Sequence, residues 1–183
     1  MRIIAGKYGG RKLEVPQNNA IRPTSDKVRG AIFNALGSRM DFDGAIVLDL
    51  FSGTGALGLE ALSRGANFCH FVDKSRSSLF LTKRNAQILG IEEQSAFLCQ
   101  DATILKKSIS ENRPAHLFFC DPPYNKALIE PTLKVLCDGQ WLSEGAIGVL
   151  EAEKGWTATL SENFEIFSQK DYGDTSIVYI RYK

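Results

Sequence analysis

The sequence predicts an α/β fold built on one mostly parallel sheet, and three features of the chain support this prediction. A near-continuous apolar run, residues 46–51, leads into a glycine-rich turn and then a segment with helical spacing, which is typical of a buried strand followed by a helix. Further strand-like and helical segments alternate along the chain, as expected for parallel strands joined by crossover helices. The last two strand-like segments have no helix between them, so we expect that pair to be antiparallel.

The expected elements follow from the hydrophobic pattern and its stop signals. The first helix begins after Thr24 or Ser25, either of which can cap it, and ends near Gly37. Pro131 fits the first turn of a helix, so we expect that helix to start near Glu130. The other expected helices cover residues 56–64, 75–89 and 102–109, and the seven expected strands cover residues 46–51, 68–73, 95–100, 115–120, 145–152, 164–169 and 175–182.

The N-terminal residues have the pattern of a small β-hairpin. Two strand-like pieces, residues 2–5 and 12–15, flank a glycine-containing connection. So short a hairpin has little to bury, so we expect it either to pack on the main body or to await a partner. We therefore divide the chain into a basic hairpin extension, residues 1–20, and a main domain, residues 21–183.

Composition places the chain among ordinary soluble globular proteins. Of its 183 residues, 44% are hydrophobic and 23% are charged, and no apolar run approaches the roughly 18 residues that a membrane span needs. Three of the four cysteines lie in apolar strand-like runs, so we expect buried free thiols, and two histidines make a zinc site improbable. We expect a cytoplasmic monomer that holds no metal and contacts no membrane.

Charge is distributed unevenly along the chain. Residues 1–30 contain seven basic and two acidic side chains, a local charge of +5 in a chain whose net charge is +1. A basic arm on a mildly acidic body indicates a polyanion contact confined to one face, although an ordinary solvated surface has the same composition. The candidate cations for this contact are Lys7, Arg11, Lys12, Lys27 and Arg29. Helical spacing places Lys27 and Arg29 off the apolar stripe of the first expected helix, so we expect them to face solvent or a ligand.

The glycine turn after the first strand is the first candidate ligand site. Gly53 and Gly55, with Gly58 after them, satisfy the dinucleotide fingerprint G-x-G-x-x-G, with Asp73 about 20 residues further on. Methyltransferases that use S-adenosylmethionine (AdoMet) have a related turn, preceded by an acid such as Asp49. A third interpretation is that the glycines only pack the helix against the sheet. A buried carboxylate is costly in an apolar strand, which favours a ligand.

Two further acids lie at the carboxyl ends of expected strands: Asp73 is the last residue of the second strand, and Asp101 directly follows the third. The carboxylate of Asp73 has two oxygens and suits a vicinal diol, so we expect it at a ribose. Asp101 is placed to reach an adenine amino group or to cap the short helix that begins at Ala102, and both roles can hold together. Ligands in open α/β sheets bind at the carboxyl ends of strands, where all these acids are expected.

The fourth expected strand ends in the candidate catalytic residues, Asp121, Pro122, Pro123 and Tyr124. Two prolines stiffen the backbone and remove two N–H donors, which leaves a carboxylate and a carbonyl as fixed acceptors. Such a pair can hold both hydrogens of an exocyclic amine, so that the nitrogen lone pair points at a sulfonium methyl group and positioning supplies most of the acceleration. The tyrosine ring offers a face on which an unstacked base can lie.

These motifs resemble those of a known family. Residues 121–124 are similar to motif IV of amino-methylating AdoMet-dependent methyltransferases, and residues 48–55 are similar to their motif I. Residues 22–29 and 33–34 resemble the N-terminal signature of the RsmD family, the bacterial 16S ribosomal RNA guanine-N2 methyltransferases. Residues 6–13 and 172–175 also fit that family, so the resemblance covers nearly the whole chain.

The resemblance implies a Rossmann-like class I methyltransferase fold and methylation of N2 of one guanine, equivalent to guanine 966, in 16S rRNA on an assembled 30S particle. It implies AdoMet as the cofactor, bound by Arg22, Thr24, Asp49, Phe51, Ser52, Gly53, Thr54, Gly55, Asp73, Asp101 and Ala102. Arg22 and Thr24 would close over the cofactor, residues 121–124 would hold the base, and the basic hairpin, with the other candidate cations of residues 1–30, would bind RNA. The chain departs from the family pattern at Asp73 and Gly30, where Glu is usual.

Three alternative functions stay open on the residues alone. A DNA adenine or cytosine amino-methyltransferase uses the same tetrapeptide, but the chain has no sizeable insertion for recognising a DNA target. An NAD(P)-dependent oxidoreductase would use the glycine turn and leave residues 121–124 unexplained. A non-catalytic RNA-binding module would have no need of Asp121.

Overall fold

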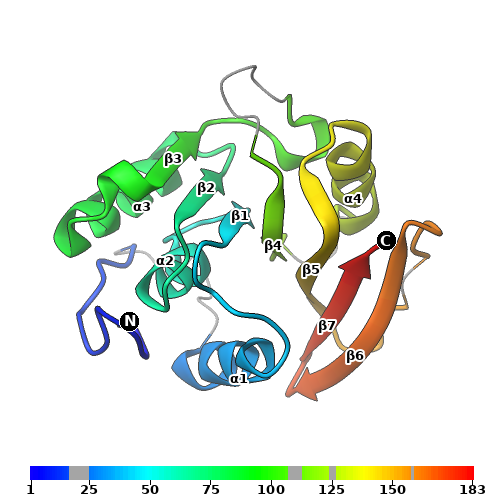
Figure 1. The fold of residues 1–183 in the computed structure, drawn as a ribbon, viewed down its shortest axis with the longest axis horizontal. Helices are drawn as coiled ribbons and strands as arrows, with labels where there is room; N and C mark the ends of the chain where they lie inside the picture. The colour runs from blue at the N-terminus through cyan, green and yellow to red at the C-terminus, as the bar shows by residue number, and fades with distance from the viewer. Residues whose placement is uncertain (17–24, 107–112, 124–126, 158) are drawn as a thin grey trace.

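The computed structural model describes residues 1–16, 25–106, 113–123, 127–157 and 159–183. Within these ranges one seven-stranded sheet runs through the molecule, with helices packed on its two faces (Figure 1). The α-helices are α1 (Asp26–Gly37), α2 (Ala56–Ser63), α3 (Arg76–Leu89) and α4 (Ile129–Asp138), and the short 3-10 helices are η1 (Glu92–Gln94) and η2 (Ala102–Ile104). The strands are β1 (Ile46–Leu50), β2 (Phe68–Val72), β3 (Ser95–Leu98), β4 (Ala115–Cys120), β5 (Leu142–Glu153), β6 (Phe164–Tyr172) and β7 (Thr175–Tyr182).

The strand order confirms the predicted fold class. The order is β3-β2-β1-β4-β5-β7-β6, so the chain winds outward in one direction through β2 and β3 and in the other through β4 and β5. The pairs β1–β2, β2–β3, β1–β4 and β4–β5 are parallel, whereas β7 lies antiparallel between β5 and β6. The switch point between β1 and β4 is where open α/β sheets bind ligands.

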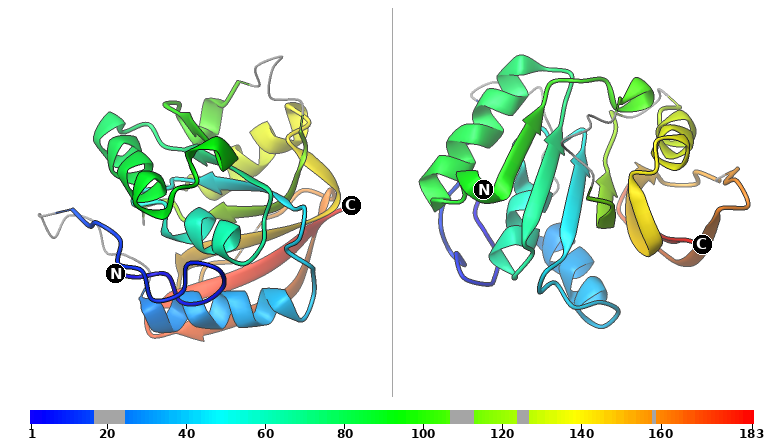
Figure 2. Two further views of the ribbon diagram at one scale, coloured as in Figure 1. Left: turned by 60° about the vertical axis from the view of Figure 1, so that its left-hand side comes forward. Right: turned by 45° about the horizontal axis from the view of Figure 1, so that its top comes forward.

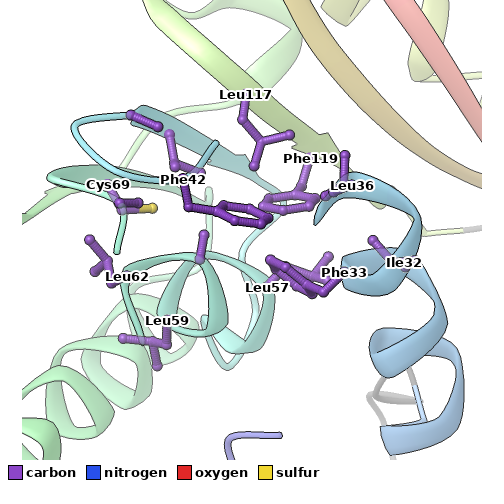
Figure 3. Packing of buried hydrophobic residues seen from close by; sticks show 14 of the residues in the cluster. Ile32, Phe33, Leu36, Phe42, Leu57, Leu59, Leu62, Cys69, Leu117 and Phe119 are labelled. Atoms are coloured by element: carbon purple, nitrogen blue, oxygen red, sulfur yellow. The ribbon is translucent and has the colours of Figure 1, made fainter. Parts of the chain in front are cut away.

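Alternating side chains of the strands divide the core into two layers. One layer packs α1, α2 and α3 against one face of the sheet, with Phe33 of α1 in contact with Phe119 of β4 (Figure 3). The other layer packs α4 and η2 against the opposite face, with Trp141 and Phe118 fully buried. Both faces of β1 and β4 are therefore covered, which explains why these strands are continuous apolar runs in the sequence.

The predicted helix ends are largely confirmed. The Ser25 hydroxyl accepts a hydrogen bond from the Val28 amide at 3.2 Å and caps α1. Ser75 caps α3 in the same way, and Gly90 ends that helix with a φ of 70°. The helix expected over residues 102–109 is the single 3-10 turn η2 as far as the structure describes it, because Leu105 leaves helical geometry with a ψ of 124°.

Several strand boundaries differ from the prediction. β3 ends at Leu98 rather than at residue 100, and β1 ends at Leu50 because Phe51 turns into the left-handed region with a φ of 59°. β5 begins three residues earlier and β6 runs three residues further than expected, since both are extended by antiparallel or irregular pairing beyond the apolar stretch.

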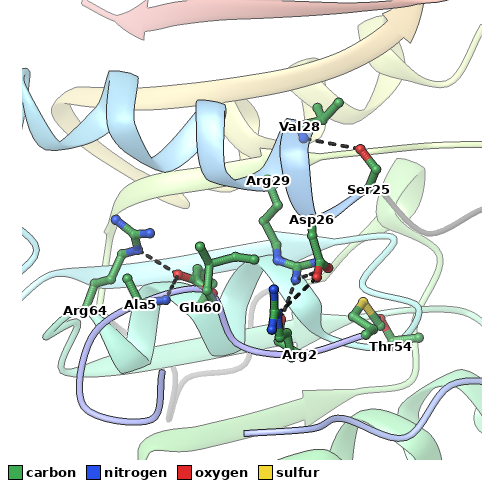
Figure 4. Close-up of polar contacts among 11 residues, drawn as sticks. Arg2, Ala5, Ser25, Asp26, Val28, Arg29, Thr54, Glu60 and Arg64 are labelled. Carbon is green, nitrogen blue, oxygen red and sulfur yellow. Dashed lines mark hydrogen bonds and ion pairs between the residues drawn. The ribbon is translucent and has the colours of Figure 1, made fainter. Parts of the chain in front are cut away.

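The N-terminal segment packs on the body and pairs with itself in antiparallel fashion, as expected of a hairpin, but residues 2–5 and 12–15 do not form strands. One isolated antiparallel bridge joins Arg2 and Lys12, and three backbone hydrogen bonds cross the hairpin, while other backbone amides of the segment bond to α2 instead. The buried Glu60 carboxylate accepts hydrogen bonds from the amides of Ile4 and Ala5 at 2.7 and 3.0 Å. Figure 2 shows the segment beside α1 and α2, and Figure 4 shows its polar contacts.

The predicted burial of the cysteines holds for two of them. Cys69 and Cys120 are buried and Cys137 is half-buried, whereas Cys99 is exposed because it follows the end of β3. All four thiols are free. Over the described ranges, no helix is long and apolar enough to cross a membrane, and no cluster of side chains could hold a metal ion.

Candidate functional site

A cleft of about 640 Å³ opens at the carboxyl edge of the sheet, where β1, β2, β4 and β5 end. It brings together residues that are far apart in the sequence, from the start of α1 to the turn between β6 and β7. Among its lining residues are Lys27, Asp49, Phe51, Ser52, Gly53, Thr54, Asp73, Asp121, Pro122, Pro123, Glu151 and Tyr172. This volume is within the usual range for a site that encloses a small organic ligand.

The glycines of the first motif have different roles. A Cβ on Gly58 would lie 2.4 Å from the Phe71 ring and 2.6 Å from the Cys69 sulfur, and a Cβ on Gly55 would lie 2.6 Å from a methyl carbon of Thr82. Gly58 therefore lets α2 pack closely on β2, as the packing interpretation proposed, and Gly55 lets the turn before α2 pack closely on α3. Gly53 borders open space, because a Cβ there would meet only the Phe51 carbonyl oxygen, at 3.9 Å. Of the three glycines, it is the one beside which a ligand has room.

Asp49 is buried at the floor of the cleft, with only 2% of its surface exposed. Its Oδ2 accepts a hydrogen bond from the Gly58 amide at 2.9 Å, so the acid ties the end of β1 to the first turn of α2. Burial raises the pKa of Asp49 to about 8, against the lowering effect of that hydrogen bond. The charge of the Asp49 carboxyl group should therefore depend on what occupies the cleft.

Asp73 lies after β2 and shapes the same turn from the other side. Its Oδ2 accepts a hydrogen bond from the Gly53 amide at 3.0 Å, and its Oδ1 accepts one from the Ser75 amide at 2.8 Å. Each carboxylate oxygen has a second lone pair, so both oxygens keep the capacity to accept from a ligand. The carboxylate thus stands in the cleft with its orientation fixed by two backbone amides.

The Ser52 hydroxyl has no hydrogen-bond partner among the described residues. Its Oγ is buried and has no hydrogen-bond partner within the part of the chain that the structure describes, although Ser52 lines the cleft. A buried hydroxyl without a protein partner is unusual and is commonly satisfied by a bound water, an ion or a ligand. This observation points to a polar ligand next to the glycine turn.

The second motif enters the cleft at the end of β4. Asp121 is half-buried, Pro122 is buried and Pro123 is exposed, and all three line the cleft. β4 pairs with β1 at Cys120 and Leu50, so the two motifs follow neighbouring strands at the same level of the sheet. Burial, with a contribution from the Asp121 charge, raises the pKa of the Cys120 thiol, so this thiol stays neutral. The prediction for Tyr124 lies outside the described residues.

One wall of the cleft was not predicted from the sequence. Glu151 of β5 and the residues Tyr172, Gly173 and Thr175 line it. Because β7 runs antiparallel to β5 and pairs Thr175 with Glu153, the turn before β7 returns to the carboxyl edge of the sheet. Glu151, like the other acids of the cleft, lies near the carboxyl end of an apolar strand, so the sequence could have predicted it. The place of the turn in the cleft follows only from the strand order.

Some predicted cofactor residues are not in the cleft. Asp101 and Ala102 do not line it: the Asp101 Oδ1 accepts hydrogen bonds from the amide and the hydroxyl of Thr103, at 2.9 and 2.7 Å. These bonds hold the pKa of Asp101 below its usual value, and they match the capping role that was the alternative prediction. Arg22 and Thr24 lie outside the described residues.

The prediction that Arg29 faces solvent or a ligand is wrong. Arg29 is fully buried, donates to the Asp26 carboxylate at 2.9 Å and also donates to the Arg2 carbonyl (Figure 4). The N-terminal segment covers this face of α1, which helical spacing alone could not reveal. Lys27 is exposed and lines the cleft, as the spacing predicted.

The remaining candidate cations lie on the N-terminal segment. Lys7, Arg11 and Lys12 are all exposed. The charged ends of Lys7 and Arg11 lie 5.3 and 5.6 Å from the centre of the Tyr8 ring, which is itself buried against the core. The buried tyrosine thus holds two cations at the surface.

Comparison with known proteins gives a consistent family. A family model described as Conserved hypothetical protein 95 matches residues 1–181. Ribosomal RNA small subunit methyltransferase D of Escherichia coli (strain K12) is 35% identical over 185 residues, which cover 96% of the chain and 87% of that protein. The protein of the same name from Haemophilus influenzae is 33% identical over 177 residues, covering 96% of the chain and 91% of that protein.

Solved structures agree with this result. The yhhF protein from Escherichia coli superposes with a TM-score of 0.86 at 30% identity, covering 100% of the chain and 98% of that structure. A crystal structure from Pyrococcus horikoshii, described as that of an RNA methyltransferase, matches with a TM-score of 0.71 at 16% identity, covering 94% of both chains. At this identity the match supports the Rossmann-like fold alone. Given the match over nearly its whole length, the chain belongs to the family described as Conserved hypothetical protein 95, the RsmD family whose motifs the sequence contains.

Proposed function

We propose that this protein transfers a methyl group from AdoMet to the exocyclic N2 of a guanine in 16S rRNA, at the position equivalent to guanine 966. The observation that carries the proposal is that the glycine turn with Asp73 and the Asp121-Pro122-Pro123 segment line one cleft. A nucleoside-binding half and an amine-binding half in one cleft are what methyl transfer to a base requires. The relatives named as small subunit methyltransferases support RNA as the substrate.

The residues present fit AdoMet as the cofactor. The Asp73 carboxylate is oriented by two amides and can accept from both hydroxyls of a ribose. The unsatisfied Ser52 hydroxyl and the open space at Gly53 provide contact with a polar group of the ligand. Asp49 lies at the floor of the cleft, where an ionised carboxylate would meet the positively charged ammonium group of the cofactor's amino-acid portion. When bound, AdoMet supplies an electrophilic methyl group.

The chain's own part in the reaction is to orient the base. The Asp121 carboxylate and the Pro122 carbonyl are acceptors for the two hydrogens of the exocyclic amine. Pro122 and Pro123 lack N–H groups and restrict the backbone, so these acceptors stay in place. Holding both hydrogens aligns the nitrogen lone pair with the methyl group, and such alignment can lower a barrier by about 7–11 kcal/mol.

The direct test is transfer of tritium from labelled AdoMet. Substrates are 30S particles and naked 16S rRNA from a bacterial strain that lacks the family's enzyme, with genomic DNA as the alternative substrate. Labelled RNA is digested to nucleosides and separated. Label in N2-methylguanosine supports the proposal, and primer extension then locates the modified position.

Other outcomes would contradict parts of the proposal. Label in another nucleoside or at another guanine would refute the assigned base, and label confined to DNA would refute RNA as the substrate. Calorimetric titration with AdoMet and with NADH separates methyl transfer from the oxidoreductase alternative, which requires binding of NADH. Comparing particles with naked RNA reveals which form the protein recognises.

A further inference from the structure

We propose that the outer face of α3 is a second RNA-docking surface, on which a base of the substrate stacks on Phe80 while Arg76 and Lys83 contact phosphates. The proposal rests on the proposed function and extends the RNA contact beyond the N-terminal segment. It starts from Phe80, an aromatic side chain that is 68% exposed on a regular helix. An aromatic ring so exposed gains little from the fold of its own chain.

The charged residues of α3 itself are all basic, although Arg84 pairs with the acid Glu14 of the N-terminal segment at 3.0 Å. α3 contains three basic side chains, Arg76, Lys83 and Arg84, and no acidic residue in its 14 positions. On a helix, residues three and four apart are neighbours, so all three cations adjoin Phe80 on the surface. Solvated helices usually mix the two signs. An exposed ring surrounded by cations is typical of single-stranded nucleic-acid binding, where bases stack on aromatics and cations follow the backbone.

The position of α3 connects this face with the cleft. Ser75 and Ser78 line the cleft, so the N-terminus of α3 lies at the site. Arg76 of the same turn begins the outer face there, and Phe80 follows one turn further along that face. The positive end of the helix dipole also lies at the cleft, which favours an anion there. An RNA strand whose target nucleotide enters the cleft could therefore continue along this face.

The far end of α3 meets the basic N-terminal segment (Figure 1). Arg11 donates to the Ile88 carbonyl at 3.4 Å, and Arg84 pairs with Glu14 at 3.0 Å while both side chains stay about half exposed. These contacts place the exposed Arg11 and Lys12 beside α3. The cations of the two elements thus form one surface that ends at the cleft.

A second copy of this chain is the competing occupant. Two copies that met through this face would bring their α3 cations together, and such like-charge contacts are unfavourable. RNA has the complementary charge. The surface is therefore assigned to RNA, and association of two copies becomes an outcome that the test can detect.

The experiment compares Phe80→Ala, Phe80→Tyr and Lys83→Glu with wild type, using 30S particles from the strain that lacks the enzyme. Matched controls are Ile104→Ala and Lys106→Glu, because Ile104 is 69% exposed and Lys106 is exposed, both near η2 on the other face of the sheet. We measure KM and kcat for particles, particle affinity at several salt concentrations, AdoMet affinity, and oligomeric state by light scattering.

Phe80→Ala should raise KM for particles about tenfold with kcat and AdoMet affinity unchanged, and Phe80→Tyr should retain wild-type KM because it keeps the ring. Lys83→Glu should weaken binding and reduce the salt slope by about one. Wild-type KM in Phe80→Ala would overturn the inference while labelled N2-methylguanosine still supported the proposed function. Dimers of wild type that Phe80→Ala dissociates would assign the face to a second copy. If wild type neither binds nor labels RNA, the proposed function fails and the inference fails with it.

Discussion

The Asp73 carboxylate accepts a hydrogen bond from the Gly53 amide at 3.0 Å, and so fixes the turn after β1 from the end of β2. We expect Asp73→Asn to weaken AdoMet binding at least tenfold, because hydrogen bonds to a charged group contribute about 1.5–3 kcal/mol. The amide substitution also presents a donor where the Gly53 amide needs an acceptor. Isothermal titration calorimetry measures the effect. Glu162→Gln, on an exposed loop, is the control, and an Asp73→Asn affinity equal to wild type would remove Asp73 from the cofactor site.

Asp121 is predicted to act on the base rather than on the cofactor. Asp121→Ala should lower kcat by about 100-fold or more, as expected when a pre-oriented electrostatic interaction with the reacting group is removed. AdoMet affinity should stay within about threefold of wild type, since Asp73 and the glycine turn are untouched. Single-turnover tritium transfer and calorimetry measure the two effects. Loss of AdoMet binding in parallel with activity would assign Asp121 to the cofactor instead.

The raised pKa of Asp49 should make the free energy of unfolding depend on pH. Burial raises its pKa to about 8 in the folded protein, whereas an unfolded chain has a value of about 3.9. Between these two pH values the folded protein holds a proton that the unfolded chain has released, so this group makes the free energy of unfolding fall as pH rises through that range. Asp49→Asn should flatten the fall. Urea unfolding at several pH values tests this, and an equal slope in both proteins would contradict the raised pKa.

The raised pKa of Asp49 also predicts that cofactor binding releases a proton. AdoMet carries positive charge, which favours the ionised form of Asp49, so binding at pH 7 should release up to about one proton. Calorimetry in two buffers with different ionisation enthalpies measures this number directly. Asp49→Asn should release none, and release that persists in this variant would point to another group.

Glu60 is predicted to anchor the N-terminal segment. The carboxylate is fully buried and accepts from the Ile4 and Ala5 amides and from Arg64. Glu60→Ala leaves these donors without an acceptor and should lower the free energy of unfolding by about 3 kcal/mol. Urea unfolding checks the value. Glu165→Ala, at an exposed position of β6, should change it by less than about 0.5 kcal/mol, and equal effects at both sites would refute the anchor.

The exposed cations of the N-terminal segment are predicted to bind RNA phosphates. Charge reversal at Lys7, Arg11 and Lys12 should weaken binding of 30S particles and reduce its salt slope by about one unit for each phosphate that the variant no longer neutralises. Binding measured from low to moderate salt gives the slope. Lys183→Glu serves as the control, and an unchanged slope in the triple variant would exclude the segment from RNA binding.

The strand-end acids of the cleft could be predicted because the rule that locates them is local. Asp49, Asp73 and Asp121 each follow or end an apolar run, and the carboxyl ends of parallel strands share one edge. Asp101 follows the same pattern but lies outside the cleft, because β3 is the outermost strand and its acid caps η2. The pattern therefore predicts that an acid lies at the carboxyl edge of the sheet, but not how far along that edge it lies from the cleft.

The other differences come from contacts between distant segments. Helical spacing leaves Arg29 off the apolar stripe of α1, yet the N-terminal segment covers that face and buries it. The wall at Tyr172 depends on β7 inserting between β5 and β6, a pairing that no local pattern encodes. Sequence therefore predicts the elements and their chemistry, while burial by non-local packing needs the structure.

The residues that line the cleft come from segments between the start of α1 and the start of β7, the first and last elements of the fold, so the cleft is complete only when nearly the whole chain has folded. A partly folded chain that lacks β7 has no complete binding site, and β6 has no neighbouring strand to pair with. If AdoMet binds as proposed, its occupancy reports completed folding, and AdoMet at about 100 times its Kd would stabilise the entire fold by about 2.7 kcal/mol against unfolding. Cells short of the cofactor should degrade this protein faster, which would link its abundance to methyl-donor supply.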